Sequence, residues 1–310
     1  MGRLERGHGR PNGPVTDMRR RRSATRSAAG STDAGAGAAF VPILLYHAVT
    51  TTPGTHIAPF TVRPEEFERQ LDAVVDAGLT AVTFGDLLRD ELDPATAAGS
   101  SLGDDDRRVV ITFDDGYADF AEHALPALQA RGLASTIFLT TGWLAGGGSR
   151  ERGPSDPMLS WSQLPELLEC GVELGAHSHS HPHMDTLRTP ALRDELVRCK
   201  EQLEDALGLP VDTFAYPHGY NGPRVRRATR ASGYRAAAAV RNALHPPGEH
   251  PFGISRITVL PTTTVRDVAG WLGGAGVPIA GPREAMATRG WRAYRRGRAL
   301  LSGAPGSDFR

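Results

Sequence analysis

Short apolar runs and longer amphipathic stretches alternate along the chain from about residue 39 onward. Residues 109–113 form a near-continuous apolar run, which is typical of a strand buried on both faces. Residues 64–75 place Phe67, Leu71, Val74 and Val75 on one face, which predicts an amphipathic helix. We predict strands over residues 40–46, 80–84, 109–113, 134–139, 173–176, 213–216, 236–240 and 257–260, and helices over residues 64–75, 84–89, 118–131, 161–170, 189–207 and 223–232. Repeated strand–helix units of this kind predict one α/β domain with a parallel sheet in a barrel-like arrangement.

Charge divides the chain into three parts. Residues 1–38 hold eight arginines against three acidic residues and almost no large apolar residue, which predicts a disordered basic tail. Residues 282–310 hold seven arginines against two acidic residues and are interpreted as a basic C-terminal tail. Residues 39–281 form the predicted folded domain. Because the formal net charge of the whole chain is zero, no global field favours a nucleic-acid partner.

Targeting signals and cysteine usage favour a cytoplasmic protein. No run of 18 apolar residues occurs, so we expect no transmembrane helix. The stretch after arginines 19–22 lacks the strong apolar run of a secretory signal peptide. Paired arginines before a mildly apolar stretch still leave twin-arginine export open. Residues 286–301 mix aromatic and apolar side chains with five arginines, so a peripheral contact with an anionic membrane is a further hypothesis. Cys170 and Cys199 have no metal-binding spacing and are expected to be buried free thiols.

Two motifs follow predicted strands and carry metal-binding side chains. Asp114, Asp115 and Gly116 directly follow the apolar run that ends at residue 113, and strand ends line the sites of parallel α/β folds. A turn or a helix cap is the alternative interpretation of that motif alone. Residues 175–183, GAHSHSHPH, carry four alternating histidines, of which His177 and His181 are four apart. Two histidines and a carboxylate are a recurrent catalytic metal set, whereas a solvated polar loop is the alternative.

A third motif, TFAYPHGY at residues 213–220, ends a predicted strand in a proline and a glycine. The backbone turns sharply there, and its N–H groups are candidates for stabilising an oxyanion. An ordinary turn explains this segment equally well when it is taken alone.

The segments TFDDG at residues 112–116, HSHSHP at 177–182 and FAYPHG at 214–219 resemble the ordered motifs of the polysaccharide deacetylase, or NodB-like, family (carbohydrate esterase family 4). The resemblance covers about residues 39–265 and implies a distorted (β/α) barrel of about seven parallel strands. It also implies one divalent metal, most often zinc. By the same resemblance the metal ligands are Asp115, His177 and His181, the general base is Asp114, Ser178 steadies the histidine loop, and Tyr216 and His218 belong to the oxyanion and substrate-binding group.

The chain departs from the family pattern in two places. The third motif usually carries an arginine where Ala215 stands, and Arg256 is a candidate to reach the same carboxylate; we group it with the substrate-binding residues. The usual late catalytic histidine is absent, since none follows His250. His245 and His250 lie in a proline-rich loop with little expected rigidity. Residues 44–49, LLYHAV, instead resemble the opening motif of the poly-N-acetylglucosamine deacetylase branch, which makes His47 the candidate acid, with a core histidine as the alternative.

These residues predict a metal-dependent hydrolase that removes acetyl groups from an N-acetylated amino sugar of a polysaccharide or glycan precursor. A metal activates water, Asp114 takes its proton and His47 protonates the leaving amine. An amidase acting on a non-sugar amide and a carbohydrate-binding pseudoenzyme are the alternatives. Trp143, Trp161 and Tyr220 are candidates for stacking on a sugar, although aromatic residues also fill cores. The partner is therefore an N-acetylated glycan, and the sequence leaves the oligomeric state open.

Overall fold

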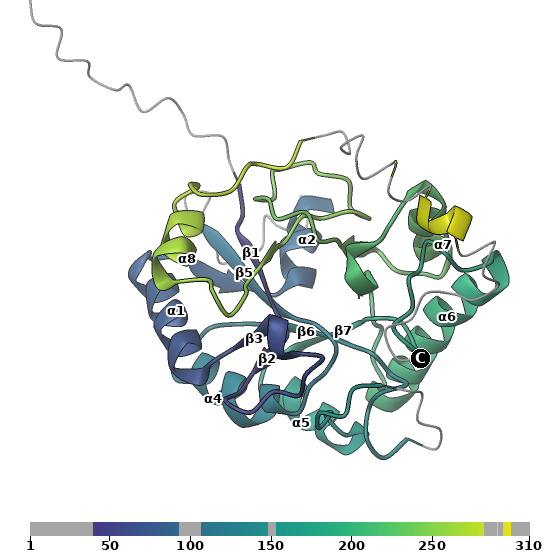
Figure 1. Ribbon diagram of the computed structural model, residues 1–310, viewed down its shortest axis with the longest axis horizontal. Coiled ribbons are helices and arrows are strands. Elements are labelled where there is room, and N and C mark those ends of the chain that lie inside the picture. The colour runs from purple at the N-terminus through teal and green to yellow at the C-terminus, as the bar shows by residue number, and fades with distance from the viewer. Residues whose placement is uncertain (1–39, 93–106, 148–152, 282–289, 291–293, 299–310) are drawn as a thin grey trace, which may run out of the picture. The chain divides into compact units, whose positions relative to one another are not determined.

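A parallel sheet forms the centre of the protein in the computed structural model, which describes residues 40–92, 107–147, 153–281, 290 and 294–298. Its strands are β1 (Ile43–Tyr46), β4 (Thr80–Val82), β5 (Arg108–Phe113), β6 (Thr136–Leu139), β7 (Glu173–Ala176), β8 (Thr213–Ala215), β9 (Ala236–Ala238) and β10 (Ile257–Thr258). Seven of them follow the order β10-β1-β5-β6-β7-β8-β9, and β4 pairs with the first half of β5 (Figure 1). The predicted distorted (β/α) barrel is confirmed.

The sheet is almost closed. A parallel bridge joins Ala238, in β9, to Ile254, which lies only three residues before β10. The Ala239 N–H donates to the Ile254 carbonyl at 2.7 Å, and the Ile254 N–H donates to the Ala237 carbonyl at 3.1 Å. Because an irregular segment rather than a full strand makes this connection, the barrel is distorted at this position.

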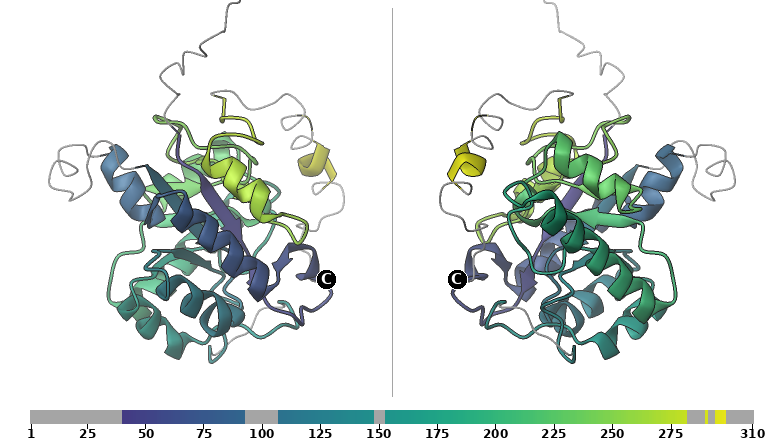
Figure 2. Two further views of the ribbon diagram at one scale, coloured as in Figure 1. Left: turned by 90° about the vertical axis from the view of Figure 1, so that its left-hand side faces the viewer. Right: turned by 90° about the vertical axis from the view of Figure 1, so that its right-hand side faces the viewer.

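Helices cover the outside of the sheet. They are α1 (Pro64–Asp76), α2 (Phe84–Leu92), α4 (Leu125–Gln129), α5 (Leu164–Glu169), α6 (Thr189–Leu207), α7 (Pro223–Ala231) and α8 (Val265–Leu272), with shorter helical turns η1 (Ala58–Phe60), η2 (Phe120–Ala124), η3 (Trp161–Gln163) and η4 (Pro217–Gly219). Figure 2 shows that α1 and α8 pack side by side on one face. Helix α1 buries Phe67, Leu71 and Val74, as predicted, but the prediction that Val75 shares this buried face was wrong, because Val75 is 49% exposed. None of the described helices is long and apolar enough to cross a membrane.

One face of α2 packs against the end of the barrel at which the strands begin. The buried side chains of Phe84, Leu87 and Leu88 form one cluster with inward-facing residues of the strands. The N-terminal end of α2 is held at the starts of two strands, because the Phe84 N–H donates to Thr136 Oγ1 and the Gly85 N–H donates to Glu173 Oε2, both at 2.8 Å. Since α2 closes the end where the strands begin, the opposite end is left for a site.

Four details of the structure differ from the prediction. The helix predicted over residues 118–131 is divided into a π-helical turn, η2, and α4, because Pro126 has no N–H to donate within a continuous helix. The prediction missed α8 and a small two-stranded sheet of β2 (Ala48–Val49) and β3 (Thr61–Val62). Cys199 is a buried free thiol, but Cys170 is only half-buried.

Candidate metal centre and active site

The side chains singled out by the sequence meet at the carboxyl ends of the strands. Asp114 and Asp115 follow β5, His177 follows β7, and His218 lies in η4 directly after β8. His47 follows β1, which pairs with β5 so that Tyr46 lies opposite Phe113. Parallel pairing therefore brings residues from distant parts of the chain to one edge of the sheet.

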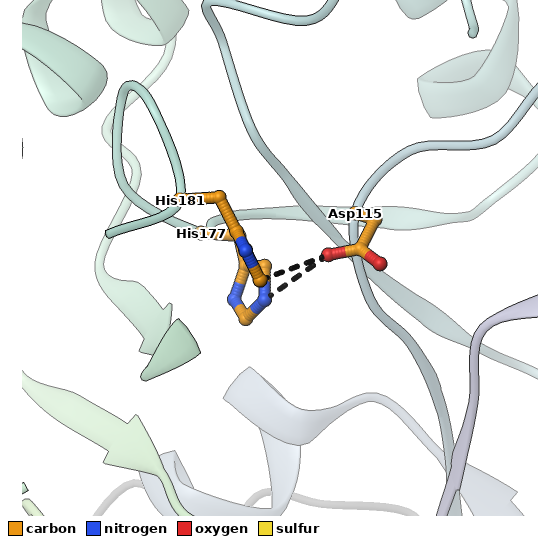
Figure 3. Close-up of side chains that lie close together, drawn as sticks. All are labelled: Asp115, His177 and His181. Carbon is orange, nitrogen blue, oxygen red and sulfur yellow. Dashed lines mark ion pairs between the residues drawn. The ribbon is translucent and has the colours of Figure 1, made fainter. Parts of the chain in front are cut away.

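Asp115, His177 and His181 converge on one point (Figure 3). Asp115 Oδ1 lies 3.4 Å from His177 Nε2 and 3.3 Å from His181 Nε2, and the candidate ligand atoms of the three residues all lie within 4.8 Å of one another. All three side chains are buried. Two ligands bound about 2.1 Å from a tetrahedral zinc ion lie about 3.4 Å apart, so both distances from Asp115 fit such an ion.

The protonation and hydrogen bonding of the cluster also fit a cation. The His177 Nδ1–H donates to the Ala215 carbonyl at 2.9 Å, which leaves Nε2 facing Asp115. Asp115 Oδ1 is buried and accepts no hydrogen bond from the described residues. Burial alone would raise the pKa of Asp115, but His181 and His177 outweigh it and hold that pKa well below its ordinary value. A buried, ionised carboxylate beside two imidazoles is a suitable donor set for a divalent metal.

Unusual backbone conformations are concentrated at this site. Five described non-glycine residues have a positive φ, and four of them are Asp115 (77°), Ser178 (67°), His181 (58°) and His218 (57°). Such conformations are unfavourable for residues with a Cβ atom and persist where the surrounding structure imposes them. The fold therefore fixes the directions of these side chains at some cost in conformational energy.

The loop between the two histidines is held from outside by Glu195 of α6. Glu195 Oε2 accepts the His179 N–H at 2.9 Å and the Ser180 N–H at 2.8 Å, and Glu195 Oε1 accepts the Ser180 hydroxyl at 2.5 Å. Within the loop, Ser178 Oγ accepts the His181 N–H at 3.0 Å. These bonds determine the loop geometry that places His181 opposite Asp115.

Asp114 is paired with Arg256, which lies just before β10. Nη1 and Nη2 of Arg256 donate to Oδ1 and Oδ2 of Asp114 at 2.7 and 2.8 Å. Both residues are buried. Burial would raise the pKa of Asp114, but Arg256 and then His177 outweigh it and hold the pKa below its ordinary value. Each carboxylate oxygen keeps a second lone pair that can accept a proton.

His47 stands beside this pair and below an exposed aromatic ring. Its ring centroid lies 5.0 Å from that of Phe60, which is 39% exposed. The buried Nδ1 atom of His47 has no hydrogen-bond partner among the residues that the structure describes. Burial lowers the pKa of His47, whereas the carboxylates of Asp115 and Asp114 act in the opposite direction.

Comparison with known proteins assigns a family to this arrangement. Residues 102–237 match the family model described as polysaccharide deacetylase. The chain carries a polysaccharide deacetylase domain. Among curated proteins, YxkH of Bacillus subtilis, whose name places it among polysaccharide deacetylases, is 22% identical over 224 residues, which are 71% of this chain and 72% of that protein. The predicted family is confirmed.

Solved structures share the fold of the deacetylase domain. IcaB from Ammonifex degensii is 26% identical with a TM-score of 0.63, over 75% of this chain and 97% of that one. The Streptococcus pyogenes deacetylase PplD, solved in complex with acetate, is 21% identical with a TM-score of 0.64, over 74% of this chain and 97% of that one.

Two of the substrate-binding candidates of the deacetylase domain are fully buried. The Tyr216 hydroxyl donates to the Phe252 carbonyl at 3.2 Å, and its N–H donates to the Ala238 carbonyl, so its polar atoms are engaged in the core. Arg256 contacts Asp114, as its position in the sequence suggested, and does not line the surface. Trp143 is only 1% exposed and packs on His181 at 4.8 Å, so it supports a histidine rather than presenting a face to a sugar.

The late histidines lie elsewhere in the deacetylase domain. His245 is fully buried between Glu91 and Glu249, with both ring nitrogens 2.9 Å from a carboxylate oxygen. The expected lack of rigidity at His245 was wrong, because these two carboxylates fix the ring. His250 is exposed and lies beside α7, where its Nδ1 accepts the Phe252 N–H at 3.0 Å. Neither has a contact with the Asp115 cluster.

The predicted boundaries at residues 38 and 281 stay predictions. Residues 1–38 lie outside the described residues, as do most of residues 282–310 and of the hypothetical membrane segment. Residues 294–298 are described and helical, and Arg295 Nη2 lies 2.5 Å from Asp185 Oδ2. The guanidinium of Arg295 also stacks on Tyr220, with 3.4 Å from its carbon to the ring centroid. This part of the basic segment contacts the domain instead of being fully solvated.

Glu195 gives the first testable prediction. Glu195→Ala removes all three hydrogen bonds that Glu195 accepts from the histidine loop, so we expect metal affinity to fall about 10–100-fold, as is typical when the support of a metal ligand is lost. Glu195→Gln should largely restore it, since an amide oxygen accepts both N–H groups and the amide nitrogen donates to Ser180. Affinity is measured by competition with a chelator. Glu201→Ala, an exposed change on the same helix, is the control, and an equal loss in that variant would contradict the prediction.

Proposed function

We propose that this deacetylase domain is a metal-dependent hydrolase that removes the acetyl group from an N-acetylated amino sugar of a polysaccharide or glycan precursor. The observation that carries the proposal is the convergence of Asp115, His177 and His181 on one point beside the Asp114–Arg256 pair. When bound there, a divalent metal, zinc according to the donor set, lowers the pKa of water and polarises a carbonyl group.

The remaining residues supply the proton transfers. Asp114 is the proposed general base, and Arg256 holds both of its oxygens in position and keeps it ionised. His47 is the proposed general acid, which donates a proton to the departing amine nitrogen. The backbone N–H of His218 is the proposed donor to the carbonyl oxygen as that oxygen gains negative charge. His245 and His250 contact other parts of the domain, which supports His47 in the acid role.

The metal assignment is tested by measuring bound metal and acetate release together. Purified protein should carry about one divalent ion per chain and release acetate from a chitooligosaccharide. His177→Ala and His181→Ala should both lose the ion and the activity, because each removes one of three proposed ligands. His123→Ala changes an exposed histidine on η2 and should lose neither. Full metal occupancy in both ligand variants would show that the ion binds elsewhere.

Two other functions are separated from this one by specific observations. A pseudoenzyme would be expected to lack a ligand or the base, whereas here the donor set is complete and Arg256 reaches Asp114 despite Ala215. An amidase acting on a cyclic imide would use the same chemistry without a sugar. The exposed ring of Phe60 beside His47 is suited to stacking on a sugar. Turnover of the imide but not of the chitooligosaccharide would favour the amidase.

A further inference from the structure

A cavity of about 950 Å³ lies beside α7, apart from the proposed catalytic site. Its wall includes Arg226, Arg227 and Arg230 of α7, Arg235 from the turn before β9, and His250. None of its described lining residues is acidic, and none belongs to the Asp115 cluster or to the Asp114–Arg256 pair. The cavity therefore concentrates positive charge in a concave space that the proposed hydrolysis does not use.

Three arginines of the cavity wall lack the ion pairs that some other exposed arginines of the chain form. Arg69 and Arg89 pair with acidic residues three positions before them on their own helices, at 2.5 and 2.6 Å. Arg227, Arg230 and Arg235 are exposed and form no ion pair with a carboxylate in the part of the chain that the structure describes. Like charges one turn apart on a helix repel each other. Because the formal net charge of the chain is zero, this excess is local and is not a consequence of a basic composition.

Part of the cavity wall is fixed before any ligand binds. The Arg226 Nε–H donates to Asn221 Oδ1 at 2.7 Å, and its guanidinium lies against the backbone of Gly253, where a Cβ atom would come within 3.0 Å of the guanidinium carbon. The His250 Nδ1 atom accepts the Phe252 N–H, so in the neutral ring the proton lies on Nε2, which is a hydrogen-bond donor. Ordered donors of this kind lose little entropy when they bind an anion.

The titration of His250 responds to the same charge. The partial desolvation of the His250 ring lowers its pKa, and the positive charges of Arg226 and Arg230 lower it further. An anion bound among these arginines would offset that effect and raise the pKa of His250.

We propose that this cavity binds a ligand that carries two or more phosphate groups. A guanidinium presents paired N–H donors that match phosphate oxygens, and two phosphates neutralise the charge of four arginines. The volume is in the range of cavities that hold sugar-sized or larger small molecules. This inference does not depend on the proposed deacetylation, because the two sites share no residue.

Calorimetric titration of the metal-loaded protein with fructose 1,6-bisphosphate tests the proposal. The double variant Arg230→Gln/Arg235→Gln should bind this probe at least about 10-fold more weakly, since each change removes a positive charge and its charged hydrogen bonds to phosphate. Arg193→Gln/Arg266→Gln, a matched pair of exposed arginines on α6 and α8, should bind like the wild type. His181→Ala should also bind like the wild type, which separates this site from the proposed metal centre. In nuclear magnetic resonance titrations, the probe should raise the pKa of His250.

Vesicles that contain cardiolipin, a lipid whose headgroup carries two phosphate groups, distinguish a lipid-borne bisphosphate from a soluble one. Binding of either the sugar bisphosphate or the vesicles, lost in the cavity variant and kept in the α6/α8 variant, supports the proposal and identifies the source. The proposal is overturned if the cavity variant binds both probes as well as the wild type does, if both double variants lose binding equally, or if the wild type binds neither probe.

Discussion

Replacement of Asp114 by asparagine should slow acetate release from an N-acetylated sugar by about 10²–10⁴-fold, the contribution typical of a positioned general base. The amide of asparagine cannot accept the proton of the attacking water. The variant should keep its metal, because Asp115, His177 and His181 are unchanged. Turnover is measured under saturating metal, together with the metal content of the same sample.

The structure also predicts a loss of stability in that variant. The asparagine side chain has one oxygen, so it can accept a hydrogen bond from only one of the two Nη atoms of Arg256. Its NH₂ group faces the other Nη atom, so the buried positive charge of Arg256 is left partly unpaired. We expect a lower melting temperature but a folded protein. Asp90→Asn is the control, because it breaks the half-buried ion pair with Arg108 at the start of β5 but does not change the proposed general base. Turnover within about tenfold of wild type in folded, metal-loaded Asp114→Asn would remove Asp114 from the mechanism.

Removal of the His47 imidazole should discriminate between substrates. An acid that protonates a departing amine is needed for amide hydrolysis but matters little when the leaving group is already a weak base. His47→Ala should therefore slow hydrolysis of an N-acetyl sugar by about 10²–10⁴-fold and hydrolysis of an activated aryl acetate far less. Both rates are measured on one preparation, and its metal content should equal that of the wild type because His47 is outside the ligand cluster.

Two controls make the His47 result specific. His123→Ala removes an exposed histidine and should change neither rate. Phe60→Leu keeps an apolar neighbour above His47 and should alter sugar binding more than the ratio of the two rates. An equal slowing of both substrates in His47→Ala, or a selective loss in His250→Ala, would rule out His47 as the acid.

The parallel strands, and the edge of the sheet that carries the candidate site, could be predicted because both are encoded by short segments of the sequence. Apolar runs such as Val109–Phe113 indicate strands that are buried on both faces of the sheet, and the polar residues after them mark the carboxyl ends of these strands. Strand β7 and helix α6 occupy the predicted residues, the helix ending where Gly208 adopts a positive φ of 65°. Helix α8 was missed although its signal is present: Thr264 and Asp267 form a capping box before an apolar stretch.

Other features depend on contacts between distant residues and leave no local pattern. Nothing near Phe84 in the sequence shows that α2 closes one end of the barrel, and nothing near Glu195 shows that it binds the histidine loop. The arginines of α7 are visible in the sequence, but only the fold shows that Arg235 and His250 join them around a cavity. Arg256 was a candidate from its position alone, and its pairing with Asp114 depends on barrel closure.

The pairing of Asp114 with Arg256 joins residues 142 positions apart, and in the proposed mechanism it makes catalytic competence a late event in biosynthesis. Until the segment before β10 has been made and docked, the carboxylate after β5 has no guanidinium to hold it, although all three candidate metal ligands have already left the ribosome. A nascent chain can therefore gather the proposed metal ligands before the proposed general base is held in place. The segment matched by the family model, residues 102–237, contains neither His47 nor Arg256, so excised on its own it would carry the proposed ligands without the proposed proton-transfer machinery.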